Sequence, residues 1–99
     1  MRTMLKVVVP VEAGNKGIKD GSIAQIIGKF VETWKPEAAY FTADQGPRTA
    51  LFVLDIKDSS DLPAIAEPFY LALNASITAT PCMNAEDLKA GLEKLSKQQ

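Results

Sequence analysis

The sequence contains no histidine and a single cysteine, Cys82, and these two shortages exclude several kinds of chemistry. Without imidazole, one chain cannot assemble a Ser-His or Cys-His pair to activate a nucleophile. Zinc, haem and iron–sulfur sites would also lack their usual ligands. We therefore expect no bound metal and no cofactor. A lone cysteine excludes an internal disulfide, which suits a reducing compartment.

Long apolar runs and an excess of positive charge are absent as well. No stretch of 18 or more apolar residues occurs, which argues against a membrane span. Lys6 and Pro10 interrupt the valine-rich start, so it lacks the apolar region of a signal peptide. The formal net charge of −1 argues against nucleic acid as a partner. We expect a cytoplasmic protein without membrane or nucleic-acid partners.

What is present is the composition of an ordinary globular chain. Hydrophobic residues make up 46% and charged residues 23% of the 99 positions. This length corresponds to one domain, and we expect a single domain over residues 1–99.

Hydrophobic periodicity predicts four strands and three helices. Alternating or β-branched segments predict strands at residues 3–11, 38–43, 48–56 and 76–83. Apolar stripes with helical spacing predict helices at residues 22–34, 58–75 and 84–99. Residues 12–22 contain three glycines and mixed charges, which predicts a loop.

Local signals refine these elements. Pro68 lies inside the second helix and should kink it. Asn74 suits a helix end because asparagine tolerates the left-handed conformation, and Asn84 is a typical N-cap for the last helix. Pro81 lacks an N–H to donate, so we expect the fourth strand at a sheet edge.

The element order is β-α-β-β-α-β followed by one extra helix, which predicts an α+β protein. Two crossovers of this kind give a ferredoxin-like plait, a four-stranded antiparallel sheet with strand order 4-1-3-2. Both main helices should then cover one face of the sheet. The second face stays bare unless another molecule covers it.

The hairpin of residues 38–56 has one register that separates its side chains into two sets. Pairing Tyr40 with Leu51 and Phe41 with Ala50 puts the small and apolar residues on the helix face. That set is Ala39, Phe41, Ala50, Phe52, Leu54 and Ile56. The second face is mixed and holds Met4, Lys6, Val8, Tyr40, Thr42, Leu51, Val53 and Thr78. This second face is too apolar to stay exposed to water and too polar for a dry core. It therefore predicts a homodimer formed through this face of the sheet.

The element order, the YF-x4-G-x-R hairpin (Tyr40, Phe41, Gly46, Arg48) and the segment AEPFYLALNA at residues 66–75 resemble a family of small uncharacterised bacterial proteins. That family is placed in the dimeric α/β barrel superfamily. The resemblance covers nearly the whole chain and implies a dimer whose sheets form a barrel, with ligand pockets between sheet and helices. It implies no particular reaction. The haem-binding members and many isomerase members use a histidine, which this chain lacks.

Four candidate ligand-binding residues belong to the second face: Lys6, Tyr40, Thr42 and Asp55. Lysine and tyrosine on an enclosed surface could polarise a carbonyl or move a proton if burial shifted their pKa values. The alternative is that they only make dimer contacts, with Lys6 paired to a carboxylate across the interface.

Two further candidates lie near loops. Glu12 follows the first strand, and its position alone makes it a candidate carboxylate base. Arg48 flanks the hairpin turn and could bind a carboxylate, whereas the simpler interpretation is a solvated charge at a strand end. Lys16 or Lys19 beside the next helix could hold an anion, or the segment is only a connector.

Three functions remain open. The first is a homodimer that binds a small molecule. The second is a cofactor-independent isomerase or monooxygenase that acts on a small aromatic or acidic metabolite. The third is a structural or regulatory dimer without a ligand. The first two require a pocket with convergent polar groups, and the third requires a filled interior.

Overall fold

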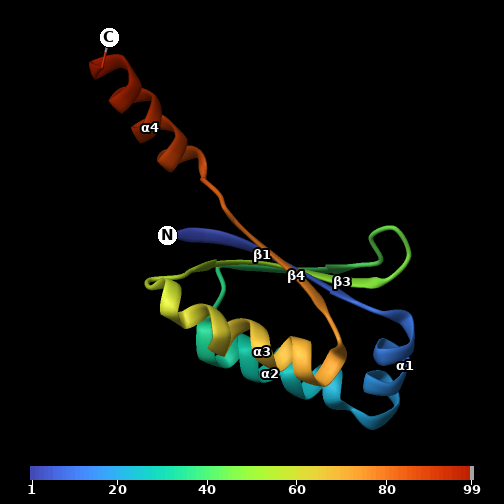
Figure 1. Ribbon diagram of the computed structural model, residues 1–99. Helices are drawn as coiled ribbons and strands as arrows, with labels where there is room; N and C mark the ends of the chain where they lie inside the picture. The colour runs from blue at the N-terminus through green and yellow to red at the C-terminus, as the bar shows by residue number, and fades with distance from the viewer. Residues whose placement is uncertain (99) are drawn as a thin grey trace.

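The computed structural model describes residues 1–98 and contains an antiparallel sheet and four α-helices (Figure 1). The elements are β1 (Arg2–Val9), α1 (Val11–Asp20), α2 (Ser22–Trp34), β2 (Ala38–Thr42), β3 (Arg48–Asp55), the 3₁₀ turn η1 (Ser59–Asp61), α3 (Leu62–Leu73), β4 (Ser76–Pro81) and α4 (Ala85–Lys97). The predicted α+β class and four-stranded antiparallel sheet are confirmed. The last helix was predicted to residue 99, which lies outside the described residues.

The strands lie in the order β2-β3-β1-β4, and each neighbouring pair is antiparallel. β4 lies at one edge, as Pro81 requires. In the hairpin, Tyr40 pairs with Leu51 and Phe41 with Ala50. This is the register that the alternation predicted, and a shift by one residue would have turned every core side chain outward.

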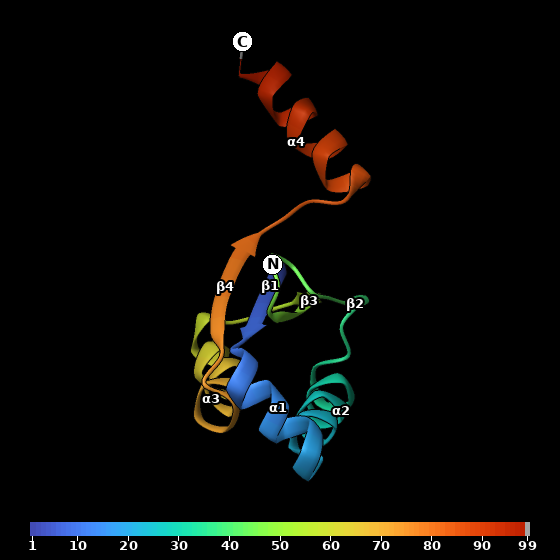
Figure 2. The ribbon, with the colours of Figure 1, turned by 90° about the vertical axis from the view of Figure 1, so that its right-hand side faces the viewer.

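The core lies between the sheet and the pair α2 and α3, which run side by side beneath one face (Figure 2). Three aromatic rings fill its centre: Phe30 of α2 lies 4.5 Å from Phe52 and 5.4 Å from Phe69 of α3, centroid to centroid. Tilted and edge-on pairs of this kind contribute about 0.5–1.5 kcal/mol each beyond their area burial. The remaining buried apolar side chains are Leu5, Val7, Val9, Ala50, Leu54, Ile56, Ile65, Leu73 and Ala75.

The prediction of a loop at residues 12–22 was wrong, because most of this segment forms α1. Gly14 and Gly17 lie one turn apart on the buried side of this helix. A Cβ at Gly17 would come 2.5 Å from the Ile23 side chain, so only glycine allows α1 to lie this close to its neighbours. Gly21 ends α1 with φ of 82°, a left-handed value that glycine adopts without strain.

The helix face of the sheet is only partly covered, which corrects a second prediction. Phe41 lies on the helix side of β2 but is 58% exposed, and its ring contacts Phe52 edge-on at 5.9 Å. Ala39 on the same strand is exposed too. β2 is an edge strand, and the helix layer leaves these two side chains exposed.

The segment predicted as one helix at residues 58–75 divides into η1 and α3. Asp58 accepts a hydrogen bond from the Ser60 backbone N–H at 3.0 Å and starts the 3₁₀ turn. α3 continues through Pro68 and ends at Asn74, whose φ of 50° confirms the predicted left-handed end.

α4 stands apart from this two-layer body. It projects beyond the sheet on the side away from α2 and α3 (Figures 1 and 2), and none of its residues is buried. The Cα radius of gyration is 15.8 Å, whereas a compact chain of this length has about 13 Å. Within residues 1–98, the helices are all too short or too polar to cross a membrane.

Candidate functional site

The face of the sheet opposite α2 and α3, called the open face below, is not covered by any helix layer within residues 1–98. The strand register arranges it in three rows across the sheet. From β2 to β4, these rows are Ala38–Val53–Met4–Thr80, Tyr40–Leu51–Lys6–Thr78 and Thr42–Thr49–Val8–Ser76. The predicted second face is therefore the open face.

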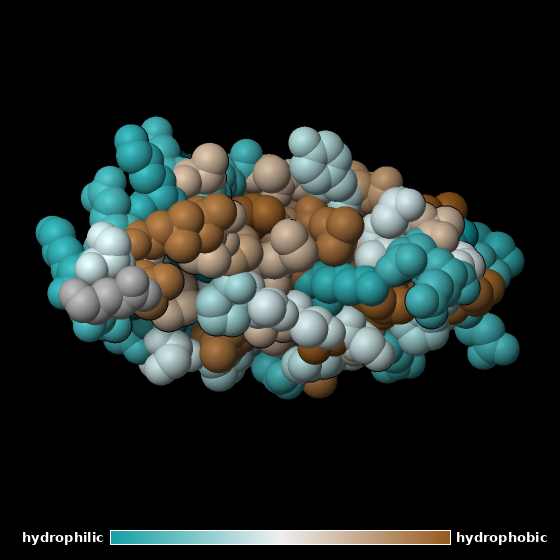
Figure 3. Space-filling view, turned by 90° about the horizontal axis from the view of Figure 1, so that it is seen from above, coloured by the Kyte–Doolittle hydropathy of each residue, from teal (hydrophilic) through white to brown (hydrophobic). Residues whose placement is uncertain are grey.

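Apolar side chains occupy the middle of the open face. Leu51, Val53 and Val8 are half-buried, Met4 is exposed, and Tyr40 at the edge is 69% exposed. Seen from above, a band of apolar side chains runs from the end with the C-terminus over the middle of the molecule (Figure 3). Hydroxyl groups of Thr78 and its neighbours on β4 border this band.

The β2–β3 hairpin tip is held over one end of the open face. Lys6 donates a hydrogen bond from Nζ to Asp44 Oδ2 at 2.7 Å, and both side chains are half-exposed. The left-handed φ values of Gln45 and Gly46 turn the loop back toward the sheet. Thr49 is buried on this side and donates to the Pro47 carbonyl at 3.1 Å. Lys6 is therefore paired with a carboxylate of its own chain.

The sequence did not predict the contact between Lys6 and Asp44. Asp44 and Lys6 are 38 positions apart. Only the backbone conformation of the turn decides whether the loop curls over the sheet or extends from it. One signal could have indicated the pair. Asp44 is a carboxylate in the hairpin turn, and Lys6 lies on β1, the strand that pairs with β3 of that hairpin.

Tyr40 and Thr42 lie on the open face as predicted, two residues apart on β2. Tyr40 shares a row with Lys6, but Leu51 separates them, so the two strand spacings put their backbones about 10 Å apart. Tyr40 on the edge strand and Lys6 on the inner strand β1 therefore do not meet.

Asp55 lies at the far end of β3, four positions along from the Lys6 row, or about 13 Å. Its Oδ1 accepts a hydrogen bond at 2.7 Å from the Met1 ammonium. This hydrogen bond and charge hold the pKa of the Asp55 carboxyl below its usual value. The structure does not bring Asp55 together with Lys6, Tyr40 or Thr42.

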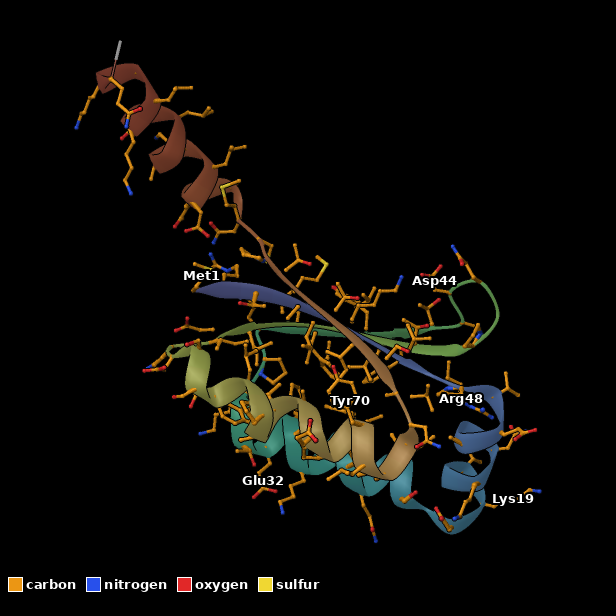
Figure 4. The ribbon with its side chains drawn as sticks, in the orientation of Figure 1. Met1, Lys19, Glu32, Asp44, Arg48 and Tyr70 are labelled. Carbon is orange, nitrogen blue, oxygen red and sulfur yellow. The ribbon has the colours of Figure 1, made fainter. Side chains whose placement is uncertain are left out.

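Arg48 and Glu12 lie away from the open face. Arg48 pairs with Val9 on the helix side, extends over Gly14 of α1 and donates to Asn15 Oδ1 at 3.1 Å. Figure 4 shows Asp44 above the sheet and Arg48 beside α1, on the other side. Glu12 is in the first turn of α1 and exposed. Lys16 and Lys19 belong to that helix, so the predicted loop beside a helix start does not exist there.

A polar depression of about 470 Å³ surrounds the foot of α4. Arg2 donates from Nε to Glu37 at 2.5 Å and also forms an ion pair with Asp87 in the first turn of α4. The bond to Glu37, followed by the interaction with Asp87, raises the pKa of the Arg2 guanidinium, so it stays charged. These contacts join the N-terminal strand, the start of β2 and α4.

A separate apolar groove of about 470 Å³ opens between α2 and α3 on the outside of the helix layer. Trp34, Phe30, Phe69 and Pro68 line it, and Lys29 lies among its few polar neighbours. The resemblance implies pockets between sheet and helices. This groove instead separates two helices, whereas a smaller depression of about 350 Å³ lies between α3 and the strands β1 and β4. The groove between the helices lacks the convergent polar groups of a catalytic site.

Comparisons with protein-family models, curated proteins and solved structures find no match to this chain. Within residues 1–98, no three histidine, cysteine, aspartate or glutamate side chains are grouped closely enough to hold a metal ion.

Proposed function

We propose that this chain forms a homodimer through its open face and that the two facing sheets enclose a chamber that binds a small molecule. The supporting observation is the open face itself, whose apolar middle stays accessible in the single chain. Two such faces packed about 10 Å apart would remove it from water. The proposed architecture is a ferredoxin-like plait assembled into a dimeric α/β barrel.

The chamber proposed here suits a small aromatic molecule with a hydroxyl or carboxylate group. Ligand sites are mostly apolar with a few polar groups that fix orientation. Leu51, Val53 and Met4 would supply apolar walls, and Tyr40 and Thr42 would supply hydroxyl groups. Lys6 already has a carboxylate partner, so an acidic ligand would compete with Asp44.

The dimer is tested with a matched pair of variants, Leu51→Glu and Leu71→Glu. Leu51 lies in the middle of the open face, and Leu71 is 79% exposed on α3, on the opposite side of the molecule. Sedimentation at micromolar concentration should give a dimer for the wild-type chain and Leu71→Glu, and a folded monomer for Leu51→Glu. A wild-type monomer contradicts the proposal, as does an unchanged dimer in Leu51→Glu.

Ligand binding is tested by thermal shift with benzoate, 4-hydroxybenzoate and related aromatic acids. A compound at about 100 times its dissociation constant adds about 2.7 kcal/mol to the stability of the folded state. Tyr40→Phe should reduce that shift, whereas Arg48→Ala should not, because Arg48 lies on the other side of the sheet. A dimer that no compound stabilises would favour a structural role.

We also propose the cytoplasm as the location. The chain has one cysteine, so it has no internal disulfide that an oxidising compartment would maintain.

A further inference from the structure

α4 has an apolar side that nothing else within residues 1–98 covers. Leu88, Leu92 and Leu95 are spaced four and three residues apart and so share one side of the helix. Each is about half exposed, and Met83 just before the helix is 64% exposed. A helix of 13 residues, about 20 Å long, is marginal in water by itself, so an unpacked amphipathic helix indicates a missing partner surface.

The foot of α4 is nevertheless fixed. Asn84 and Asp87 form a capping box, with Asp87 N–H to Asn84 Oδ1 at 2.8 Å and Asn84 N–H to Asp87 Oδ2 at 3.1 Å. Arg2 pairs with Asp87, and the Cys82 N–H donates to the Arg2 carbonyl at 3.0 Å. For α4 to fold back onto its own sheet, the ion pair between Arg2 and Asp87 would have to break. The partner surface therefore lies outside the chain.

The direction of α4 identifies that partner. Figures 1 and 2 show α4 rising from the end of β4 on the same side as the open face. A molecule that covers the open face would lie beside α4. In Figure 3, apolar side chains are seen at this end as well as over the middle of the molecule.

The surface area of the chain agrees with a partner of its own kind. The chain exposes 6871 Å², whereas a compact monomer of 10.7 kDa exposes about 5500 Å². The surplus of about 1400 Å² exceeds the roughly 800 Å² that each partner buries in a standard interface. The surplus surface of the chain is therefore large enough for its share of a stable dimer interface.

We propose that α4 is an arm that crosses to a second copy of this chain and packs its leucine side against that copy. The proposal depends on the homodimer proposed above and adds a second contact region to it. Arg2 is the positioning residue, because its ion pair with Asp87 sets the angle at which the arm leaves the sheet.

The test compares two full-length variants. The first, Leu88→Gln with Leu92→Gln and Leu95→Gln, removes the apolar side, and glutamine preserves helix propensity. The control, Glu93→Gln with Lys97→Gln, alters the opposite side and leaves the net charge unchanged. The leucine variant should weaken dimerisation at least tenfold in sedimentation, and the control should not. Arg2→Gln should weaken it less, with α4 helicity unchanged by circular dichroism.

A direct readout comes from a mixed sample of labelled and unlabelled chains. Isotope-filtered NOEs should connect leucine methyl groups of one chain to protons of the other, and Leu88, Leu92 and Leu95 should be among them. If the dimer forms but these methyl groups show no NOE to the other chain, the arm proposal is overturned and the open-face dimer stands. If the wild-type chain is monomeric, both proposals are overturned.

Discussion

Two aspartates bind backbone N–H groups at the starts of helical segments. Asp20 accepts from Ser22 N–H at 2.8 Å, and Asp58 accepts from Ser60 N–H at 3.0 Å. These bonds hold the pKa of both carboxyls below the usual value of about 3.9. A depressed pKa in the folded state means that the ionised form stabilises the fold at neutral pH.

The stability of the chain should therefore depend on these two groups in acid. Their contribution is fully present above the unfolded pKa of about 3.9 and is lost as the pH falls through the lower folded values. Asp20→Asn with Asp58→Asn keeps both acceptors without titration. When the pH is lowered from 7 to 3, the denaturant midpoint should decrease less in this variant than in the wild-type chain. An equal decrease in both proteins would show that these two carboxylates do not contribute to the loss of stability in acid.

At the residue scale, alternation predicted the sides of the sheet but not the contacts. Tyr40, Thr42 and Lys6 lie on the open face because side chains on a strand alternate between faces. The partners of Lys6 and Arg48 followed from features that no local pattern contains. Lys6 meets Asp44 because the hairpin loop curls back over the sheet, and Arg48 reaches α1 because Gly14 leaves room for its guanidinium group.

At the element scale, the glycines of the helices differ in what surrounds them. An alanine Cβ at Gly17 would lie 2.5 Å from Ile23 Cγ1 and 3.3 Å from Leu73 Cδ2, whereas at Gly28 of α2 it would meet no atom within 4 Å. Substitution by alanine should therefore stabilise the fold at Gly28 and destabilise it at Gly17.

Gly28→Ala should raise the free energy of unfolding by up to about 1 kcal/mol, because alanine favours the helix. Gly17→Ala should lower it by about 1–2 kcal/mol, since crowding costs more than the propensity gains. Thermal midpoints at equal chain concentration, which shift by about 4–8 °C per kcal/mol, measure both effects. A stabilising Gly17→Ala would mean that α1 can move away from α2 and α3.

The same glycines explain why α1 was not predicted. Glycine disfavours helices by about 1 kcal/mol per residue, so three glycines in eight positions indicate a loop. Close packing of α1 against Ile23 and Leu73 outweighs this unfavourable helix propensity. By contrast, α2 and α3 were found because their apolar stripes face the core directly, with Phe30, Ile65 and Phe69 buried. Phe41 was misplaced because alternation gives the side of a strand and not the extent of the layer that covers it.

At the scale of the whole molecule, the single chain is more extended than its length requires. Its longest extent is 56 Å against 28 and 17 Å in the other directions, and α4 accounts for the elongation (Figure 1). Edge strand β2, the open face and the leucine side of α4 are all exposed. A second copy that covers the last two would convert an elongated chain into a compact assembly.

Small-angle scattering can detect this change in shape. A compact assembly of two chains has a radius of gyration of about 16 Å, close to the 15.8 Å of one extended chain. Forward scattering should therefore give twice the mass of one chain with almost no increase in radius. A dimer whose arms stay extended should have a clearly larger radius of gyration, which would contradict docking of α4 but not the open-face dimer. The triple leucine variant, at concentrations that still give a dimer, should move toward that larger value.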